Sequence, residues 1–280
     1  MTNPVSVTRN GRRTFLKWHR ARRTASDPVF TGKRILEGMA LGASVEVDLV
    51  VHRGGGFAVL HDHLSIARET TGEGPAGGLS ADELRALHLR GNDGRPIAAH
   101  VMLLGDLCTL LAQTPPHPDA LLQLDYKEDE TVLDPAAIAS FVVSATPVAR
   151  NMIVSSGSAA AVNLLTAEVP GIRIGYDPCS DENIAALRQS RDYAGFVTDA
   201  VNASPDAEMI YLAWELVIEL DKAGYDVIGA FHAAAKRVDV WTIRVADETT
   251  RPIVERLLAL GADQITTDDP EGLAALIGGK

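Results

Sequence analysis

The feature that most constrains the fold of this chain is a repeated alternation of short β-branched segments with helical segments. Strands are predicted at residues 14–19, 44–51, 121–127, 151–155, 172–175, 195–198, 238–243 and 264–267. Helical patterns lie between or after them, at residues 33–41, 135–144, 159–167, 214–223, 252–260 and 271–277. A strand-then-helix order indicates a parallel sheet, and a strand count near eight indicates its closed form. We therefore predict an α/β fold, a (β/α)8 TIM barrel, which routinely holds about 250 residues in one domain.

Two segments depart from this alternation. Residues 1–13 are polar and basic, so we expect a flexible lead-in there and one barrel domain over residues 14–280. Residues 62–119 are too long for one loop and one helix, and they are rich in Gly, Thr and Asp before a helical pattern at 80–88. We interpret them as a small insertion after the second strand, holding an extra hairpin or helix. The pattern over residues 183–209 is too weak to define boundaries.

Charge and hydropathy restrict the partners. The formal net charge of −11 argues against nucleic acid, because a phosphate backbone requires a basic surface. A small anionic substrate stays compatible, because a bound divalent cation and a few local bases can reverse the field inside a cleft. No window of about 20 apolar residues is present, so no membrane span is predicted. The oligomeric state is not defined by the sequence.

Two cysteines and one arginine pair bear on location. Cys108 and Cys179 are far apart and have no zinc-binding spacing, which fits a reducing compartment. Arg12 and Arg13 resemble the start of an export signal, but the apolar stretch that such a signal needs does not follow. We therefore expect a cytoplasmic protein.

The segment Ser44–Val51 contains two acidic residues on one face of an apolar strand. Side chains of a strand alternate between its faces, so Glu46 and Asp48 share a face while Val45, Val47 and Leu49 share the other. Two carboxylates in such a place are costly unless a cation compensates them, and a hard divalent cation is the natural partner. The alternative is a half-exposed strand whose acidic face is solvated.

Other polar residues follow the predicted strands where each one ends. The carboxyl ends of barrel strands converge on one rim, where catalytic residues gather. Side chains from several strand ends could therefore meet around one cation: His19, Glu46, Asp48, His61, Asp125 and Lys127. A single histidine at a strand end is more often a structural residue, but several such residues together are difficult to attribute to core packing.

These residues occur within an ordered set of motifs. They are His19-Arg20, Gly42-Ala43-Ser44-Val45-Glu46-Val47-Asp48, Leu60-His61-Asp62, Arg68-Glu69-Thr70-Thr71-Gly72, Trp241-Thr242 and Gly261-Ala262-Asp263-Gln264-Ile265-Thr266-Thr267-Asp268-Asp269-Pro270. The set resembles the glycerophosphodiester phosphodiesterase family from about Phe15 to Pro270, with a diffuse middle part. Each motif alone is weak, and their order makes the resemblance specific.

The resemblance implies a role for each matching residue. His19 and His61 match the general base and general acid, and Glu46 and Asp48 match two ligands of a divalent metal ion. Asp125 stands where the family usually has a third ligand, a Glu, and Arg20 and Lys127 match the cations that hold the phosphate. The implied cofactor is a divalent metal ion, Mg²⁺ or Ca²⁺, and carboxylate ligands serve Mn²⁺ as well. The implied reaction is hydrolysis of a small glycerophosphodiester to sn-glycerol 3-phosphate and an alcohol.

Several positions depart from the family pattern or extend it. Ala21 replaces a Gly, and Val29 and Phe30 replace the Glu and Asn of a Pro-Glu-Asn-Thr motif. Arg244 replaces an Asn and adds positive charge near the rim. Further candidates for the pocket are Trp18, His63 and Trp241.

These departures indicate a divergent member of the family and leave two alternatives open. The first is a related phosphodiesterase acting on a sugar or lysophospholipid head group. The second is a barrel that binds phosphorylated ligands without turnover. The two histidines favour an enzyme, because a binding protein needs no acid–base pair.

Overall fold

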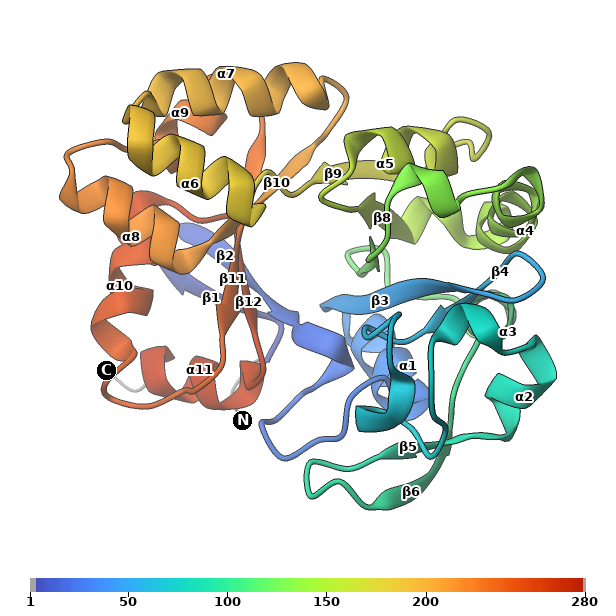
Figure 1. Cartoon of the computed structure of the whole chain (residues 1–280). Coiled ribbons are helices and arrows are strands. Elements are labelled where there is room, and N and C mark those ends of the chain that lie inside the picture. Colours follow the sequence, from blue (N-terminus) through green and yellow to red (C-terminus); the bar gives the residue numbers. More distant parts are fainter. Residues whose placement is uncertain (1–3, 279–280) are drawn as a thin grey trace.

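The structure is a computed structural model that describes residues 4–278. Within this range, eight parallel strands close into a barrel, with helices packed around its outside (Figure 1). The ring closes where β12 pairs with β2 and β2 pairs with β3. In ring order the strands are β2 (Arg12–Trp18), β3 (Ser44–His52), β7 (Leu121–Tyr126), β8 (Met152–Ser155), β9 (Arg173–Tyr176), β10 (Met209–Ala213), β11 (Arg237–Ile243) and β12 (Gln264–Thr267). The predicted (β/α)8 barrel is confirmed.

The outer helices begin at side chains that suit helix starts. Asp134 accepts a hydrogen bond from the Ala137 amide and precedes Pro135, while Ser158 and Ser180 cap the next two helices in the same way. Apolar faces of the helices pack on the outward side chains of the strands to form the main core. The helices of the ring are α1 (Gly32–Leu41), α3 (Leu104–Gln113), α4 (Pro135–Ala145), α5 (Ala159–Thr166), α6 (Asp181–Ser190), α7 (Tyr193–Ala203), α8 (Trp214–Lys222), α9 (Val227–Ala233), α10 (Arg251–Leu260) and α11 (Pro270–Gly278).

The sixth predicted strand was wrong. Residues 195–198 lie inside α7, because the Asp192 side chain caps this helix by accepting the Gly195 amide at 2.8 Å. Val197 and Ala200, three residues apart, then share the buried face of the helix. The strand that completes the ring is β10, which the sequence pattern missed. Every residue of β10 is buried, so it shows no alternation of polar and apolar side chains.

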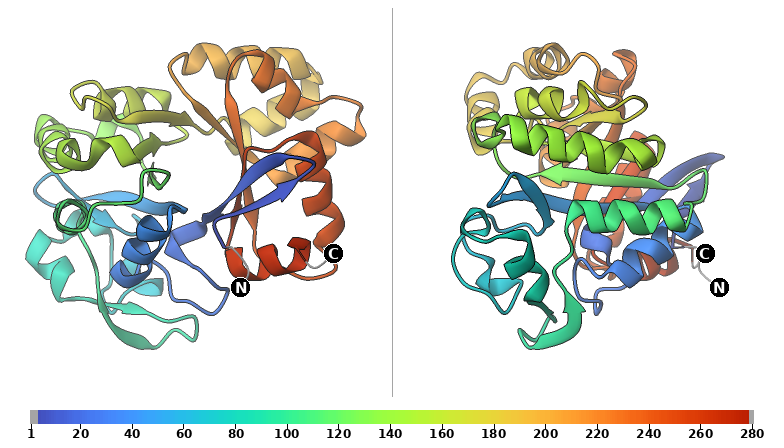
Figure 2. Two further views of the ribbon diagram at one scale, coloured as in Figure 1. Left: turned by 180° about the vertical axis from the view of Figure 1, so that it is seen from behind. Right: turned by 90° about the vertical axis from the view of Figure 1, so that its right-hand side faces the viewer.

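The N-terminal segment also differs from the expectation. Residues 1–3 lie outside the described range, but β1 (Ser6–Arg9) pairs antiparallel with β2 and is ordered as part of the sheet. Figure 2 shows this hairpin in dark blue, on the side of the molecule where both ends of the chain lie.

The segment after β3 is built from several small elements. β4 (Gly56–Val59) forms a hairpin with β3 through Gly54 and Gly55, both in the left-handed region. It is followed by 3-10 turns, α2 (Ala81–Ala86) and a hairpin of β5 (His88–Arg90) and β6 (Pro96–His100). α3, which falls within residues 62–119, is instead the ring helix between β3 and β7.

Part of the barrel interior is polar. Lys17, only 1% exposed, forms an ion pair of 3.2 Å with the Oδ2 atom of Asp239, and it also donates to Gln123. Asp239 accepts further hydrogen bonds from Gln264 and Thr266, both at 2.6 Å. The carboxylate of Asp239 is fully buried and is therefore held by three neighbours inside the barrel.

Removal of the cation from this pair should reduce stability strongly. We expect Lys17→Met to lower the free energy of unfolding by about 3–5 kcal/mol, because Asp239 would stay buried without a positive charge. Adding Asp239→Asn to this variant should recover most of the loss, since both charges are then gone. Urea denaturation followed by circular dichroism measures both changes. Wild-type stability of the single variant would contradict this account.

Candidate active site

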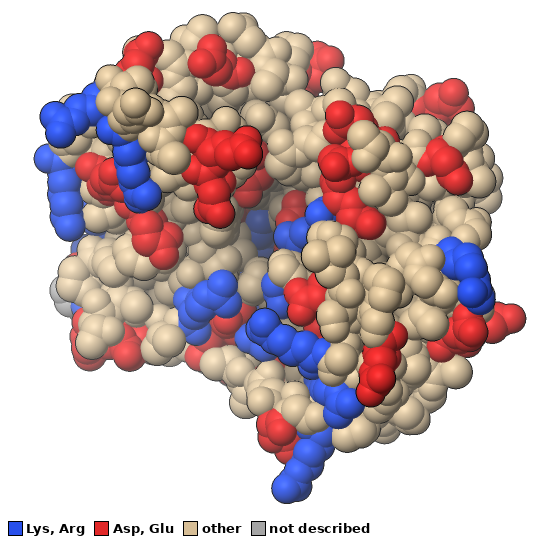
Figure 3. Space-filling view, in the orientation of Figure 1, with Lys and Arg blue, Asp and Glu red and all other residues tan. Residues whose placement is uncertain are grey.

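A cavity of about 240 Å³ opens at the carboxyl ends of the barrel strands. Figure 3 shows a hollow at the centre of this face, with basic and acidic side chains both inside it and along its edges. The lining comes from at least six barrel strands and the turns after them: Lys17, His19, Arg20, Glu46, His61, Gln123, Asp125, Lys127, Asp177, Tyr211, Trp241, Thr242, Arg244 and Thr266. The strand-end side chains of the sequence analysis thus meet at one place, apart from Asp48, which is buried against two of the lining residues, Arg20 and Lys127.

The turn after β2 places the backbone amide and the guanidinium of Arg20 beside the two acids of β3. Residues His19–Ala21 form a 3-10 turn in which Arg20 and Ala21 have φ values of 51° and 60°. The Arg20 amide donates to Glu46 Oε2 at 2.6 Å, and its guanidinium lies 3.2 Å from Asp48 Oδ2. The left-handed region favours glycine, so Ala21 is strained at the position where the family pattern has Gly.

His19 is held by a carboxylate at the end of β12. Its Nδ1 atom lies 2.5 Å from Asp268 Oδ1, and Arg22 contacts the other oxygen of Asp268 at 3.2 Å. Burial lowers the pKa of His19, although the Asp268 carboxylate acts in the opposite direction. With Nδ1 engaged by Asp268, the neutral ring presents its Nε2 atom as a proton acceptor.

Three carboxylates from neighbouring strands form a cluster beside this turn. Asp48 of β3 lies opposite Asp125 of β7 in the sheet, and oxygens of Glu46, Asp48 and Asp125 all lie within 4.8 Å of one another. Burial, followed by the charge of Asp48, raises the pKa of Glu46 well above its usual value. Burial acts in the same direction on Asp48, but Lys127 and Arg20 outweigh it and hold the pKa of Asp48 at about 2.

The donor set of this cluster fits a hard divalent cation. Both Asp48 oxygens are buried, and the groups that face them are cationic, Arg20 at Oδ2 and Lys127 at Oδ1. Lys127 Nζ forms an ion pair with Asp48 Oδ1 at 2.8 Å and contacts Asp125 as well, so an ammonium group offsets part of the acidic charge. Clustered carboxylate oxygens are the ligands that Mg²⁺, Ca²⁺ and Mn²⁺ take.

A short chain of hydrogen bonds that begins at the neighbouring strand orients Asp125. Ser155 donates to Asp125 Oδ1 at 2.6 Å, and Gln123 donates to Ser155 at 2.8 Å. Gln123 in turn accepts from Lys17. The polar interior of the barrel thus supports the acidic cluster, as residues behind metal ligands commonly do.

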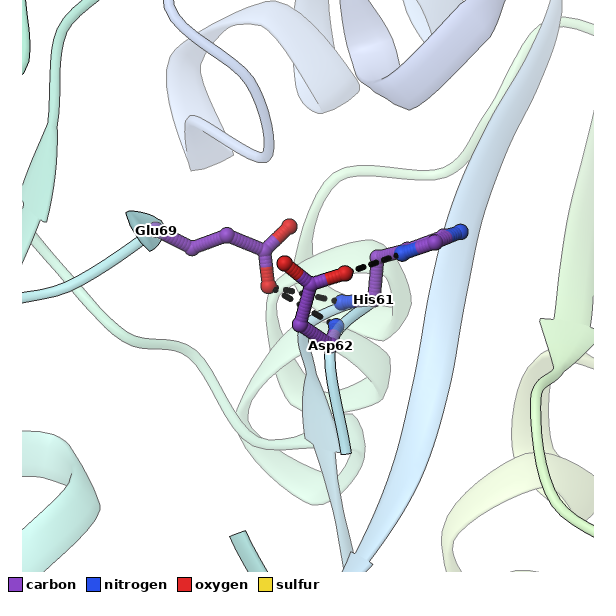
Figure 4. A group of neighbouring side chains, drawn as sticks. All are labelled: His61, Asp62 and Glu69. Atoms are coloured by element: carbon purple, nitrogen blue, oxygen red, sulfur yellow. Dashed lines mark hydrogen bonds and ion pairs between the residues drawn. The ribbon is translucent and has the colours of Figure 1, made fainter. Parts of the chain in front are cut away.

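His61 follows β4 and also lines the cavity. Its Nδ1 atom lies 2.7 Å from Asp62 Oδ1, which leaves Nε2 free to act on a ligand (Figure 4). The backbone amides of His61 and Asp62 both donate to Glu69 Oε2, at 3.0 and 3.1 Å. The side chain of His61 is 34% exposed, so it remains accessible from the cavity.

The remaining candidates are divided between the cavity and other places. Trp241 and Arg244 line the cavity, but Trp18 does not. Trp18 is fully buried on the outer side of β2, where it packs against Gly38 of α1 and its indole donates to Pro4, because the outward side chains of β2 face the helices. His63 lines an adjoining open groove with Leu64 and Glu128.

Phe30 stands where the family pattern has an Asn. It is buried and has a φ of 58°, and its ring centroid lies 5.9 Å from the Arg20 guanidinium. Asn tolerates this left-handed conformation better than Phe does. Phe30 therefore places an aromatic ring beside Arg20.

Sequence reasoning missed several residues of the site. Asp177 follows β9, and burial raises its pKa to about 7. Asp268 follows β12, so the strand-end rule that selected His19 could have found both acids. Glu69 follows the 3-10 turn Ile66–Arg68, and although the motif at residues 68–72 contains it, nothing in the sequence indicated its approach to Arg20 and His61.

A parallel barrel whose rim joins two imidazoles, a carboxylate cluster and several cations is typical of a barrel enzyme. The sequence model of the glycerophosphoryl diester phosphodiesterase family matches residues 35–272. No curated protein matches the chain. The chain belongs to the glycerophosphoryl diester phosphodiesterase family and is a phosphoric diester hydrolase.

Solved structures share this fold at low sequence identity. A glycerophosphodiester phosphodiesterase from Agrobacterium tumefaciens is 21% identical, with a TM-score of 0.64 over 95% of this chain and 99% of that one. The enzyme from Thermotoga maritima is 19% identical, with a TM-score of 0.65 over 92% and 96%. A phosphodiesterase from Oleispira antarctica, solved with the product sn-glycerol 3-phosphate, is 18% identical, with a TM-score of 0.66 over 94% and 96%.

Proposed function

We propose that this chain hydrolyses glycerophosphodiesters to sn-glycerol 3-phosphate and an alcohol, with His19 and His61 as the acid–base pair and with a divalent metal ion. The observation that carries the proposal is the shared cavity. His19 and His61 line it together with Glu46 and Asp125, and the buried Asp48 contacts two further lining residues, Arg20 and Lys127. A family relative solved with sn-glycerol 3-phosphate supports the same product.

The two histidines are equipped for opposite proton transfers. His19 has a lowered pKa, so its Nε2 atom can take the proton from an attacking hydroxyl near neutral pH. His61 Nε2 would donate a proton to the oxygen of the departing alcohol. As the family resemblance implies, the neighbouring glycerol hydroxyl forms the new O–P bond while the bond to the alcohol breaks. Water then opens the cyclic phosphate.

Charged side chains of the cavity would bind the phosphate. Arg20 and Lys127 lie on the cavity, and each already contacts a carboxylate of the cluster. Glu46, Asp48 and Asp125 would hold the cation. When bound, a divalent cation polarises a phosphoryl oxygen and offsets the charge that develops on it.

A second candidate function rests on Phe30. Val29 and Phe30 stand where the family pattern has a Glu and an Asn, respectively. The loss of these polar groups favours a related phosphodiesterase that acts on a sugar or lysophospholipid head group.

Within residues 4–278, no helix is both long enough and apolar enough to cross a membrane. The cytoplasmic location and the absence of nucleic acid partners remain predictions.

Release of product from defined substrates separates the two functions. Purified protein is incubated with glycerophosphocholine, glycerophosphoethanolamine or glycerophosphoglycerol and Mg²⁺, and sn-glycerol 3-phosphate is measured by a coupled dehydrogenase assay. We expect turnover of at least one of these substrates. Inactivity on all three, together with turnover of a lysophospholipid or a sugar phosphodiester, would replace the first function by the second.

A further inference from the structure

The turn that carries Glu69 is fixed to the protein on both sides. The Glu69 amide donates to Ile66, and the Glu69 carbonyl accepts from the Arg90 amide at 2.8 Å. Arg90 also reaches back through its side chain to the Thr70 carbonyl at 2.6 Å. These contacts direct the Glu69 side chain inward, where only 6% of the residue is exposed.

One carboxylate oxygen of Glu69 holds the backbone that carries His61. Oε2 accepts the amide protons of both His61 and Asp62, as Figure 4 shows. Two adjacent amides that point at one oxygen fix the orientation of this short turn. Asp62 then fixes the ring of His61 through Nδ1, so the backbone and the side chain of His61 are each held by one acid.

The other oxygen of Glu69 faces Arg20. Oε1 lies 3.9 Å from an Arg20 guanidinium nitrogen, is buried, and accepts no hydrogen bond from the residues that the structure describes. Arg20 therefore lies between Asp48 of β3 and Glu69 of the turn after β4. Burial lowers the pKa of Arg20, but the carboxylates of Asp48, Glu46 and Glu69 together raise it by more, so the guanidinium stays charged.

A second metal site is a less suitable explanation for this cluster. Ligand atoms of His61, Asp62 and Glu69 lie within 4.8 Å of one another, which is close enough for a shared cation. However, Oε2 already accepts two amide protons, and Nδ1 of His61 is engaged by Asp62. The charge of Arg20 beside Oε1 also disfavours a cation at that oxygen.

We propose that Glu69 is the positioning residue that sets His61 and Arg20 relative to each other beside the carboxylate cluster. The inference rests on the proposed function, since it assigns His61 and Arg20 to the acid and to the phosphate-binding cation. Because placement within a fraction of an ångström governs proton transfer, loss of Glu69 should act on turnover through His61. It should act on substrate binding through Arg20.

The test is a double-mutant cycle between Glu69 and His61. We expect Glu69→Ala to lower kcat by about tenfold to a hundredfold in the wild-type background. In the His61→Ala background the same change should lower kcat by less than about threefold, because residues acting as one unit are not additive. Full additivity would show that Glu69 acts independently of His61 and would overturn the proposal.

Two further variants separate charge from backbone anchoring. Glu69→Gln keeps an oxygen for the two amides but removes the charge beside Arg20, so we expect a rise in KM larger than the fall in kcat. Glu83→Gln is the matched control, because the Glu83 carboxylate also accepts a backbone amide, from Ser80, and pairs with an arginine, Arg53. The control should leave both constants unchanged. Equal effects at Glu69 and Glu83 would overturn the proposal.

Amide hydrogen exchange tests the anchoring without any substrate. In Glu69→Ala the amides of His61 and Asp62 should exchange faster than in the wild type, whereas Glu69→Gln, the safer variant for folding, should retain most of the protection. Unchanged exchange in Glu69→Ala would refute the anchoring. An inactive wild type would instead refute the proposed function and leave this measurement valid.

Discussion

Replacing His61 by alanine is expected to lower kcat on a glycerophosphodiester at least about a hundredfold, the usual scale of a lost general acid. His61 is partly exposed at the cavity, and its Nδ1 atom is engaged by Asp62, so Nε2 is the atom that would donate the proton. Steady-state rates of sn-glycerol 3-phosphate release measure the effect. KM should change little, because the phosphate is bound by other residues.

Two neighbouring histidines make this prediction specific. His63 lies in the adjoining groove rather than on the cavity, so His63→Ala should cost less than about threefold. His100 lies on β6 in the hairpin of the insertion and should tolerate the same change. If His61→Ala kept most of its activity while His63→Ala lost it, the general acid would be His63.

Removal of divalent cations is expected to abolish activity. Excess EDTA should bring the rate of product release to background. Addition of Mg²⁺, Ca²⁺ or Mn²⁺ in excess of the chelator should restore this rate for at least one of the three ions. The physical reason is the cluster of three carboxylates, whose oxygens lie within 4.8 Å of one another and suit a divalent cation. Full activity in excess chelator would remove the metal from the mechanism.

A single ligand substitution connects this requirement to the cluster. Asp48→Asn keeps the shape of the fully buried side chain but removes its charge, so the metal concentration for half-maximal activity should rise by about tenfold or more. Asp181→Asn, at an exposed acid in the first turn of α6, should leave the metal dependence unchanged. An unaltered metal response in Asp48→Asn would place the cation elsewhere.

The site residues that the sequence predicted are those whose positions depend on local patterns along the chain. Glu46 and Asp48 share a face because strand periodicity is local, and His19 and Lys127 reach one rim because the parallel strands β2 and β7 end together. His61 reaches the same cavity after β4, which runs antiparallel to β3, so the rule of parallel strand ends does not explain its position. Trp18 and His19 are adjacent in sequence yet point to opposite sides of β2. The periodicity that places Glu46 and Asp48 together also separates His19 from Trp18, so it could have excluded Trp18 from the pocket.

By itself, the sequence determined the barrel, the rim that carries the chemistry and the family, since each depends on strand order and motif order along the chain. Tertiary structure decided the rest. It placed β10 where a buried apolar run has no periodicity to reveal it, and it paired Lys17 with Asp239 inside the barrel. It also brought Glu69 between His61 and Arg20. Such contacts join residues distant in sequence, and their energies depend on burial, which only the folded chain defines.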